Sequence, residues 1–256
     1  MPRSVTPLDV PDPALPRAVV EAPEERSTSP DPFADVPSPR RVAVTYLLGL
    51  VAMIATLTVI GVVLTSTDAL EGVREWDLSI SSDVADNRTA DAVDLARFIT
   101  KMGDTLAILG LMAAVTIVLA VLRKWRAILF LPMAMLAEIT TFLSVNQLVG
   151  RERPPVEKLG PLPGTYSFPS GHVAATLVCW VGIGVLLVAY GFIRSGVLVV
   201  IAGAVMAAAM AWARVYVGMH YTTDVIFGFA MGVAALVLVV LVLRIHVFRT
   251  LVTGTV

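Results

Sequence analysis

The sequence predicts an all-α integral membrane protein: a bundle of six transmembrane helices that follows a disordered N-terminal tail. Of its 256 residues, 57% are apolar and only 15% are charged, whereas soluble domains carry about 25% charged residues. The apolar residues also fall into long stretches, and a helix needs about 20 of them to cross a bilayer. So few charges cannot cover a water-soluble surface, so we expect the lipid bilayer to surround the protein.

The same counts exclude other classes of protein. The formal net charge is −1 and the chain has no basic block, so we predict no nucleic-acid partner. A single cysteine excludes a domain held together by disulfides.

Residues 1–41 form the predicted tail. They hold 10 of the 16 prolines and no apolar run, so they cannot bury enough surface to offset the entropy of ordering. No apolar segment precedes position 42, so this is not a secretory signal. We expect an inert tail rather than a partner-binding one. A membrane domain at 42–245 and a short C-terminal tail at 246–256 complete the predicted organisation.

Six stretches are long and apolar enough to be spans. Glu138 interrupts the third, and because its burial is costly, a functional role and a role in helix pairing are both open. The spans are Val42–Thr65, Thr105–Leu122, Ala127–Val149, Val173–Ile193, Ser195–Ala213 and Val225–Leu243.

A polar stretch, Asp68–Asp104, separates the first two spans. Apolar residues recur in its second half at helical spacing, opposite charged ones. This pattern leaves two interpretations open: an amphipathic helix at the outer interface, or a second span that begins early. The apolar residues are Val93, Ala96, Ile99 and Met102, and the charged ones are Asp91, Asp94 and Lys101.

The short loops predict the orientation. If six spans alternate, one side collects basic residues with no acidic residue among them outside the tail, and the positive-inside rule makes that side cytoplasmic. We therefore predict a multi-pass protein of the plasma (inner) membrane with both termini in the cytoplasm. The basic residues are Arg40, Arg41, Arg123, Lys124, Arg126, Arg194, Arg244 and Arg249.

Three polar segments interrupt the apolar sequence, and the alternation of spans places all three at the outer face. They are Asn146–Pro154, Pro169–His172 and Arg214–Asp224. The first closes the third span, the second opens the fourth, and the third joins the fifth and sixth. Three such segments at one depth predict a pocket.

The residues of this pocket suit an anion such as phosphate. Arg151, Arg153 and Arg214 supply planar, permanently charged donors. Ser170 and Gly171 open the fourth span, where free backbone N–H groups and the helix dipole favour an anion.

Two of the three histidines lie in the same segments. His220 and Asp224 are four residues apart and share a helix face if the sixth span begins near Met219. The carboxylate would then accept the imidazole N–H and leave the other nitrogen free to attack a substrate. His172, on a different span, is available as a general acid. The remaining histidine, His246, falls at the cytoplasmic end, so we predict no metal and no other cofactor.

These motifs resemble those of the type 2 phosphatidic acid phosphatase family, the membrane lipid phosphate phosphatases related to vanadium haloperoxidases and glucose-6-phosphatase. The family motifs K-x6-R-P, P-S-G-H and S-R-x5-H-x3-D correspond to NQLVGRERP (146–154), PSGH (169–172) and ARVYVGMHYTTD (213–224). Their order and spacing agree, and the resemblance covers about residues 42–245.

The resemblance implies a metal-independent hydrolase of a lipid phosphomonoester or pyrophosphate at the outer face. His220 would attack phosphorus to form a phosphohistidine, His172 would protonate the leaving group, and water would release phosphate. A lipid phosphotransferase and a non-catalytic lipid or anion binder or transporter are the alternatives. The residues implied to bind the phosphoryl oxygens are Arg153, Arg214, Ser170 and Gly171.

Two positions depart from the family pattern. Asn146 stands in place of lysine and Ala213 in place of serine, and both changes remove a phosphate donor. Arg151 either replaces the missing charge or faces water and lipid head groups.

Overall fold

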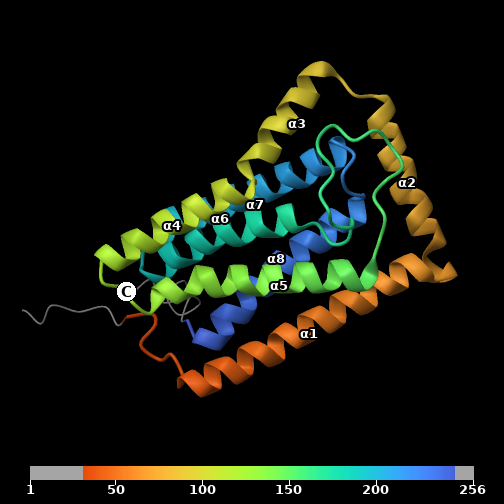
Figure 1. The fold of residues 1–256 in the computed structure, drawn as a ribbon. Coiled ribbons are helices and arrows are strands. Elements are labelled where there is room, and N and C mark those ends of the chain that lie inside the picture. Colours follow the sequence, from red (N-terminus) through yellow and green to blue (C-terminus); the bar gives the residue numbers. More distant parts are fainter. Residues whose placement is uncertain (1–30, 246–256) are drawn as a thin grey trace, which may run out of the picture.

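The computed structural model describes residues 31–245, and every regular element among them is helical. Figure 1 shows a bundle with α2 and α3 meeting at an angle beyond one end. This arrangement confirms the predicted all-α class. The elements are α1 (Pro39–Ser66), η1 (Asp68–Leu70), α2 (Glu71–Asp86), α3 (Ala90–Met102), α4 (Thr105–Val121), η2 (Ala127–Leu129), α5 (Phe130–Val149), α6 (Gly171–Ala189), α7 (Ile193–Tyr216) and α8 (Thr222–Leu243).

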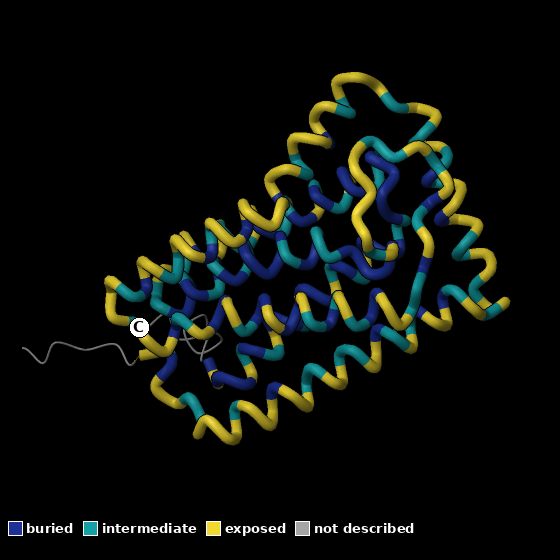
Figure 2. The backbone as a smooth tube through the Cα atoms, in the orientation of Figure 1, coloured by how far each residue is buried: buried dark blue, intermediate teal, exposed yellow. Residues whose placement is uncertain are grey.

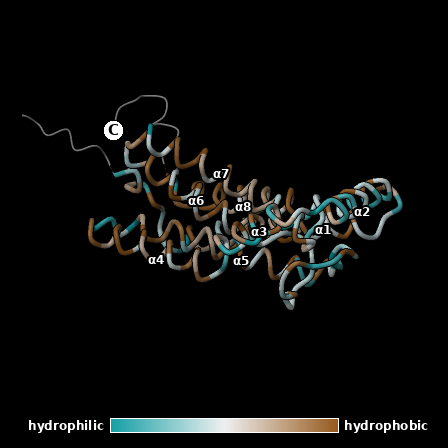
Figure 3. The backbone as a smooth tube through the Cα atoms, turned by 90° about the horizontal axis from the view of Figure 1, so that it is seen from above, coloured by the Kyte–Doolittle hydropathy of each residue, from teal (hydrophilic) through white to brown (hydrophobic). Residues whose placement is uncertain are grey.

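Within the described residues, five helical segments are each long and apolar enough to cross a membrane: α1, η2 with α5, α6, α7 and α8. The sixth candidate is α3 with α4, a pair bent by 44°. Leu48, Leu106 and Leu198 are among many large apolar side chains exposed on the outside of the bundle, and Figure 3 shows hydrophobic residues along these helices. Such a surface suits lipid rather than water. The chain is a multi-pass membrane protein.

The segment between the first two spans contains the expected amphipathic helix. It forms α3, which packs on α7 through Ala96 and Ala213. Because α3 and α4 together are long and apolar enough for one span with a bend of 44°, a second span that begins early stays a prediction. The helix α2 was not predicted, because its many charged residues resemble a loop, yet its Asp77 is fully buried.

The predicted N-terminal tail is only partly described. Residues 1–30 and residues 246–256, with His246 and Arg249, lie outside the described residues. Residues 31–38 lie against the bundle: the Phe33 side chain is fully buried, and its carbonyl accepts a hydrogen bond from Arg126 Nη1 at 3.1 Å. The first helix begins at Pro39, three residues before the predicted span.

The central helix is α6, which packs against α5, α7 and α8, and Figure 2 shows buried residues concentrated along it. Helices α6 and α7 approach closely, since a Cβ on Gly184 would lie 2.8 Å from the Gly196 carbonyl oxygen. At one end of the bundle, the 150–170 loop folds beside the α7–α8 connection (Figure 1).

Candidate active site

The three polar segments meet at the end of the bundle where α5 ends and α6 and α8 begin. Gly150 ends α5 in the left-handed conformation (φ 62°) and turns the chain into the 150–170 loop. Gly218 (φ 77°) makes the turn after α7, where a Cβ would lie 2.5 Å from the Glu157 carbonyl oxygen. A left-handed turn this close to another backbone requires glycine. The two turns bring the loop and the His220 segment to one cavity.

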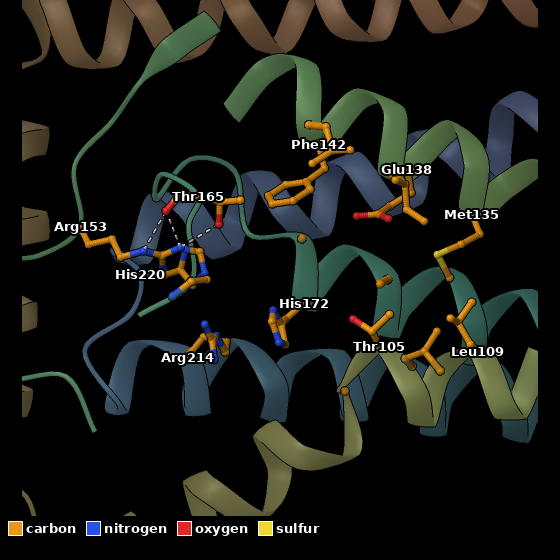
Figure 4. Close-up of a pocket in the computed structure, with 17 residues that line it drawn as sticks. Thr105, Leu109, Met135, Glu138, Phe142, Arg153, Thr165, His172, Arg214 and His220 are labelled. Carbon is orange, nitrogen blue, oxygen red and sulfur yellow. Dashed lines mark hydrogen bonds between the residues drawn. The ribbon is translucent and has the colours of Figure 1, made fainter. Parts of the chain in front are cut away.

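This cavity has a volume of about 320 Å³ and lies between α4, α5, α6, α7 and the loop. Figure 4 shows His172, Arg214 and His220 together in one part of it. The other part is apolar and is built by α4 and α5, so the cavity combines a charged compartment with one suited to hydrocarbon. The apolar side chains are Ile108, Leu109, Met135, Ile139, Phe142 and Leu143.

A second cavity, of about 520 Å³, shares His172 and Arg214 with the first. Its wall includes Arg97 and Lys101 of α3, and Asp104, which directly precedes α4. Charged side chains therefore line both cavities.

His220 is only 2% exposed, and its Nδ1 lies 2.7 Å from the backbone carbonyl oxygen of Ser167. Because a carbonyl oxygen can only accept, Nδ1 carries the proton and Nε2 keeps its lone pair. The nearest Asp224 oxygen is 3.7 Å from Nδ1, too far for a hydrogen bond. The condition for a shared helix face is not met, because α8 begins at Thr222 and His220 lies in the connection before it.

Asp224 orients His220 through Ser167 instead. The Asp224 side chain is fully buried, and its Oδ2 accepts hydrogen bonds from the Ser167 hydroxyl and, at 2.8 Å, from the Tyr221 N–H. The Asp224 carboxylate thus positions Ser167, and the Ser167 carbonyl positions the His220 imidazole. Ser167 lies two residues before the P-S-G-H motif, and no spacing rule in the sequence singled it out.

Arg151 serves this carboxylate rather than the cavity. Its Nη1 donates to Asp224 Oδ1 at 2.5 Å and to Thr223 Oγ1 at 2.7 Å, and its Nη2 donates to Asp77 Oδ2 at 2.8 Å. Its guanidinium also stacks over the Tyr221 ring, 4.1 Å from the centroid. The two carboxylates outweigh the effect of burial and raise the pKa of Arg151. Neither predicted alternative, phosphate or solvent, matches this placement, because a buried carboxylate pair attracts the guanidinium more strongly.

Asn146 likewise has protein partners. Its Nδ2 donates to the carbonyl oxygens of Tyr166 and Phe168 at 3.0 and 3.1 Å, and its Oδ1 accepts from the Tyr166 N–H at 2.9 Å. The side chain is fully buried and does not line the cavity. It holds the 150–170 loop to α5, which differs from the expected weak phosphate donor.

Arg153 lines the cavity and also fixes the loop. Its Nη1 donates to the Met219 carbonyl at 2.6 Å, and its Nη2 donates to the Thr165 and Tyr166 carbonyls at 3.1 and 3.0 Å. Burial lowers its pKa, against the opposing effect of Asp224. Its position beside His220 places a cation at the edge of the charged compartment (Figure 4).

Arg214 is a buried cation whose surroundings favour a bound anion. It lies in the last turn of α7 and is 5% exposed, and within residues 31–245 its Nε has no hydrogen-bond partner. Burying an incompletely paired charge costs free energy, so an anion in the cavity would recover part of that cost. His172 lines the same cavity.

The start of α6 completes the compartment. Gly171 lines the cavity and no side chain caps the helix, so the first N–H groups of α6 are open to an anion. Ser170 does not line the cavity: its N–H donates to the Asp224 carbonyl at 3.0 Å, and its Cβ lies against Gly228 of α8.

The protonation of His220 gives a first prediction. Burial lowers its pKa to about 4; Arg214 and Arg153 act in the same direction, and Asp224 acts against them. The pKa of a histidine in the unfolded chain is about 6.5. Between this pH and the folded pKa, the unfolded state binds more protons than the folded state. The contribution of His220 to the free energy of unfolding therefore decreases as the pH falls. In ¹⁵N-imidazole NMR, we expect His220 to remain the neutral Nδ1–H tautomer down to about pH 5. Absence of the signal in His220→Asn assigns it; a midpoint near pH 6.5 would contradict the burial.

Comparisons with known proteins fit this arrangement. A family model described as the PAP2 superfamily matches residues 105–247. The structure of a transmembrane PAP2-type phosphatidylglycerolphosphate phosphatase from Bacillus subtilis aligns with a TM-score of 0.62 and 24% identity, covering 77% of this chain and 92% of the other. Aquifex aeolicus LpxE aligns with a TM-score of 0.51 and 21% identity, covering 65% and 94%. No curated protein sequence matches the chain.

Proposed function

Because the chain belongs to the PAP2 superfamily, we propose that it is a membrane lipid phosphatase that hydrolyses a phosphomonoester or pyrophosphate. The observation that carries this proposal is the buried Arg214 guanidinium, which lines one cavity with His172 and His220 and whose Nε has no hydrogen-bond partner in the part of the chain that the structure describes. A phosphoryl group is the anion that two histidines and a guanidinium can both bind and transform.

The chemistry follows from the two imidazoles. Nε2 of His220 attacks phosphorus while the bond from phosphorus to the leaving oxygen breaks, and His172 gives that oxygen a proton. Arg214, Arg153 and the start of α6 stabilise the charge on the other phosphoryl oxygens. Water then attacks the phosphohistidine and gives a proton to His172, and phosphate departs with both imidazoles restored.

The proposed site faces the outside of the plasma membrane, with both termini in the cytoplasm. The connections between α4 and α5 and between α6 and α7 lie at the end of the bundle opposite the cavity. They carry Arg123, Lys124, Arg126 and Arg194, and such basic loops favour the cytoplasmic side.

The proposal is tested by phosphate release from phosphatidate, phosphatidylglycerophosphate and polyprenyl pyrophosphate, using protein purified in nanodiscs. We expect release from at least one lipid, unchanged by a chelator, because within residues 31–245 no three His, Cys, Asp or Glu residues lie together as metal ligands do. Activity lost in chelator and restored by a divalent cation would contradict the mechanism. A phosphorylated acceptor in place of free phosphate would indicate a phosphotransferase.

A further inference from the structure

One buried carboxyl group in the cavity takes no part in this chemistry. Glu138 lies in α5, is 2% exposed, and lines the same cavity as His172 and Arg214. Its Oε1 has no hydrogen-bond partner among the residues that the structure describes. Burying a carboxyl group without a partner costs free energy. A bound molecule that offered it a hydrogen bond would recover that cost.

The helix places Glu138 deeper than the histidines. Met135, Glu138 and Phe142 are three and four residues apart, so they share one face of α5, and all three line the cavity. Phe142 touches the start of α6, because a Cβ on Gly171 would lie 3.1 Å from its ring. Gly171 directly precedes His172, so Phe142 lies at the level of the histidine. Glu138 lies one helical turn, about 6 Å, from Phe142 along α5, in the direction away from the end of the helix. Figure 4 shows the Glu138 carboxyl between Phe142 and Met135, on the side of α5 that faces His172 and Thr105.

The surroundings of Glu138 are those of a lipid chain. Apart from Thr105 at the start of α4, the neighbouring wall is apolar and includes Leu109 and Ile139. A lipid whose phosphate lies at His220 would therefore extend past Glu138. A polyprenyl chain offers this carboxyl nothing to bind. A glycerolipid carries ester carbonyl groups only a few bonds from its phosphorus.

We propose that the Glu138 carboxyl hydrogen-bonds an ester carbonyl of the substrate, so that the cavity selects a diacylglycerol phosphate over a polyprenyl phosphate. In its acid form a carboxyl group donates its O–H to a carbonyl oxygen. The inference rests on the proposed phosphatase function and narrows its substrate class to acyl glycerolipids.

Three variants separate binding from folding. Glu138→Met keeps the volume and removes hydrogen bonding, and Glu138→Gln keeps an amide donor. Thr141→Val is the control. Thr141 is also a buried residue of α5, its hydroxyl has no hydrogen-bond partner among residues 31–245, and it does not line the cavity. Losing an unsatisfied buried group relieves the protein of its desolvation cost, so we expect Glu138→Met to melt no lower than the wild type.

The readout is kcat/KM for a diacylglycerol phosphate, its dialkyl ether analogue and a polyprenyl phosphate. We expect Glu138→Met to lower kcat/KM for the diacylglycerol phosphate about tenfold, mainly by raising KM. A tenfold change corresponds to the loss of one buried hydrogen bond. The variant should leave the ether and polyprenyl values unchanged. Glu138→Gln should retain most of the diacyl value, and Thr141→Val should behave as the wild type.

Equal losses on the diacyl and polyprenyl lipids, or an unchanged diacyl value in Glu138→Met, would overturn the inference. If the wild-type protein releases phosphate from none of these lipids, the proposed function fails instead. Binding of a non-hydrolysable diacylglycerol phosphonate then carries the test. Tenfold weaker binding by Glu138→Met supports the subsite, and equal binding by the two proteins overturns it.

Discussion

Replacing His220 by asparagine is expected to lower phosphate release by about four orders of magnitude or more. The asparagine amide can donate to the Ser167 carbonyl as Nδ1 of His220 does, so the fold should survive. The variant lacks the Nε2 lone pair that attacks phosphorus. A rapid quench with ³²P-labelled substrate should trap an acid-labile phosphoenzyme in the wild type and none in the variant.

His172→Asn provides the contrast, because His172 acts on the leaving group. We expect a loss of about 10²–10⁴-fold with a lipid alcohol as leaving group. With p-nitrophenyl phosphate, whose leaving group needs no proton, the loss should be much smaller. His220→Asn should remain inactive on both. Activity of His220→Asn within tenfold of the wild type, or identical substrate profiles of the two variants, would show that the roles are misassigned.

The second large effect is expected at Arg151. Arg151→Met would leave the carboxylates of Asp77 and Asp224, both fully buried, without the cation between them. Breaking such a pair by removing one partner costs about 3–5 kcal/mol. We therefore expect a large drop in the free energy of unfolding and a loss of turnover seen in kcat rather than KM. Denaturant unfolding measures the first effect and steady-state kinetics the second. Arg194→Met is the control, because Arg194 is exposed and lies at the start of α7, away from the cavity.

Partner variants distinguish this role from direct phosphate binding. Asp77→Asn combined with Arg151→Met should cost less than the sum of the two single changes, because it removes one of the two uncompensated charges. Asn146→Lys should not rescue Arg151→Met, since it breaks the bonds from Asn146 to Tyr166 and Phe168. Rescue by Asn146→Lys, with stability unchanged in Arg151→Met, would instead favour Arg151 as a phosphate ligand.

The sequence by itself determined the class of fold and the place of the site. Apolar stretches must become helices in a bilayer, because every backbone polar group there needs an internal partner. Their alternation brings the three polar segments to one end, as the structure shows. The sequence also predicted that histidines and arginines from different segments gather in one pocket. His172, Arg214 and His220 do line one cavity, although apolar helices separate them in the sequence.

Only the tertiary structure decided which side chains face the cavity. The 150–170 loop has no period, so its residue types could not show that Arg151 turns to Asp77 while Arg153 reaches the cavity. Asp77 is 74 residues away from Arg151 in the chain, and no local pattern encodes such a contact. Likewise, the three-residue difference between a helix beginning near Met219 and one beginning at Thr222 changed the partner of His220 from a carboxylate to the Ser167 carbonyl. Helix ends and loop paths are set by long-range hydrogen bonds, because short polar segments have little conformational preference of their own.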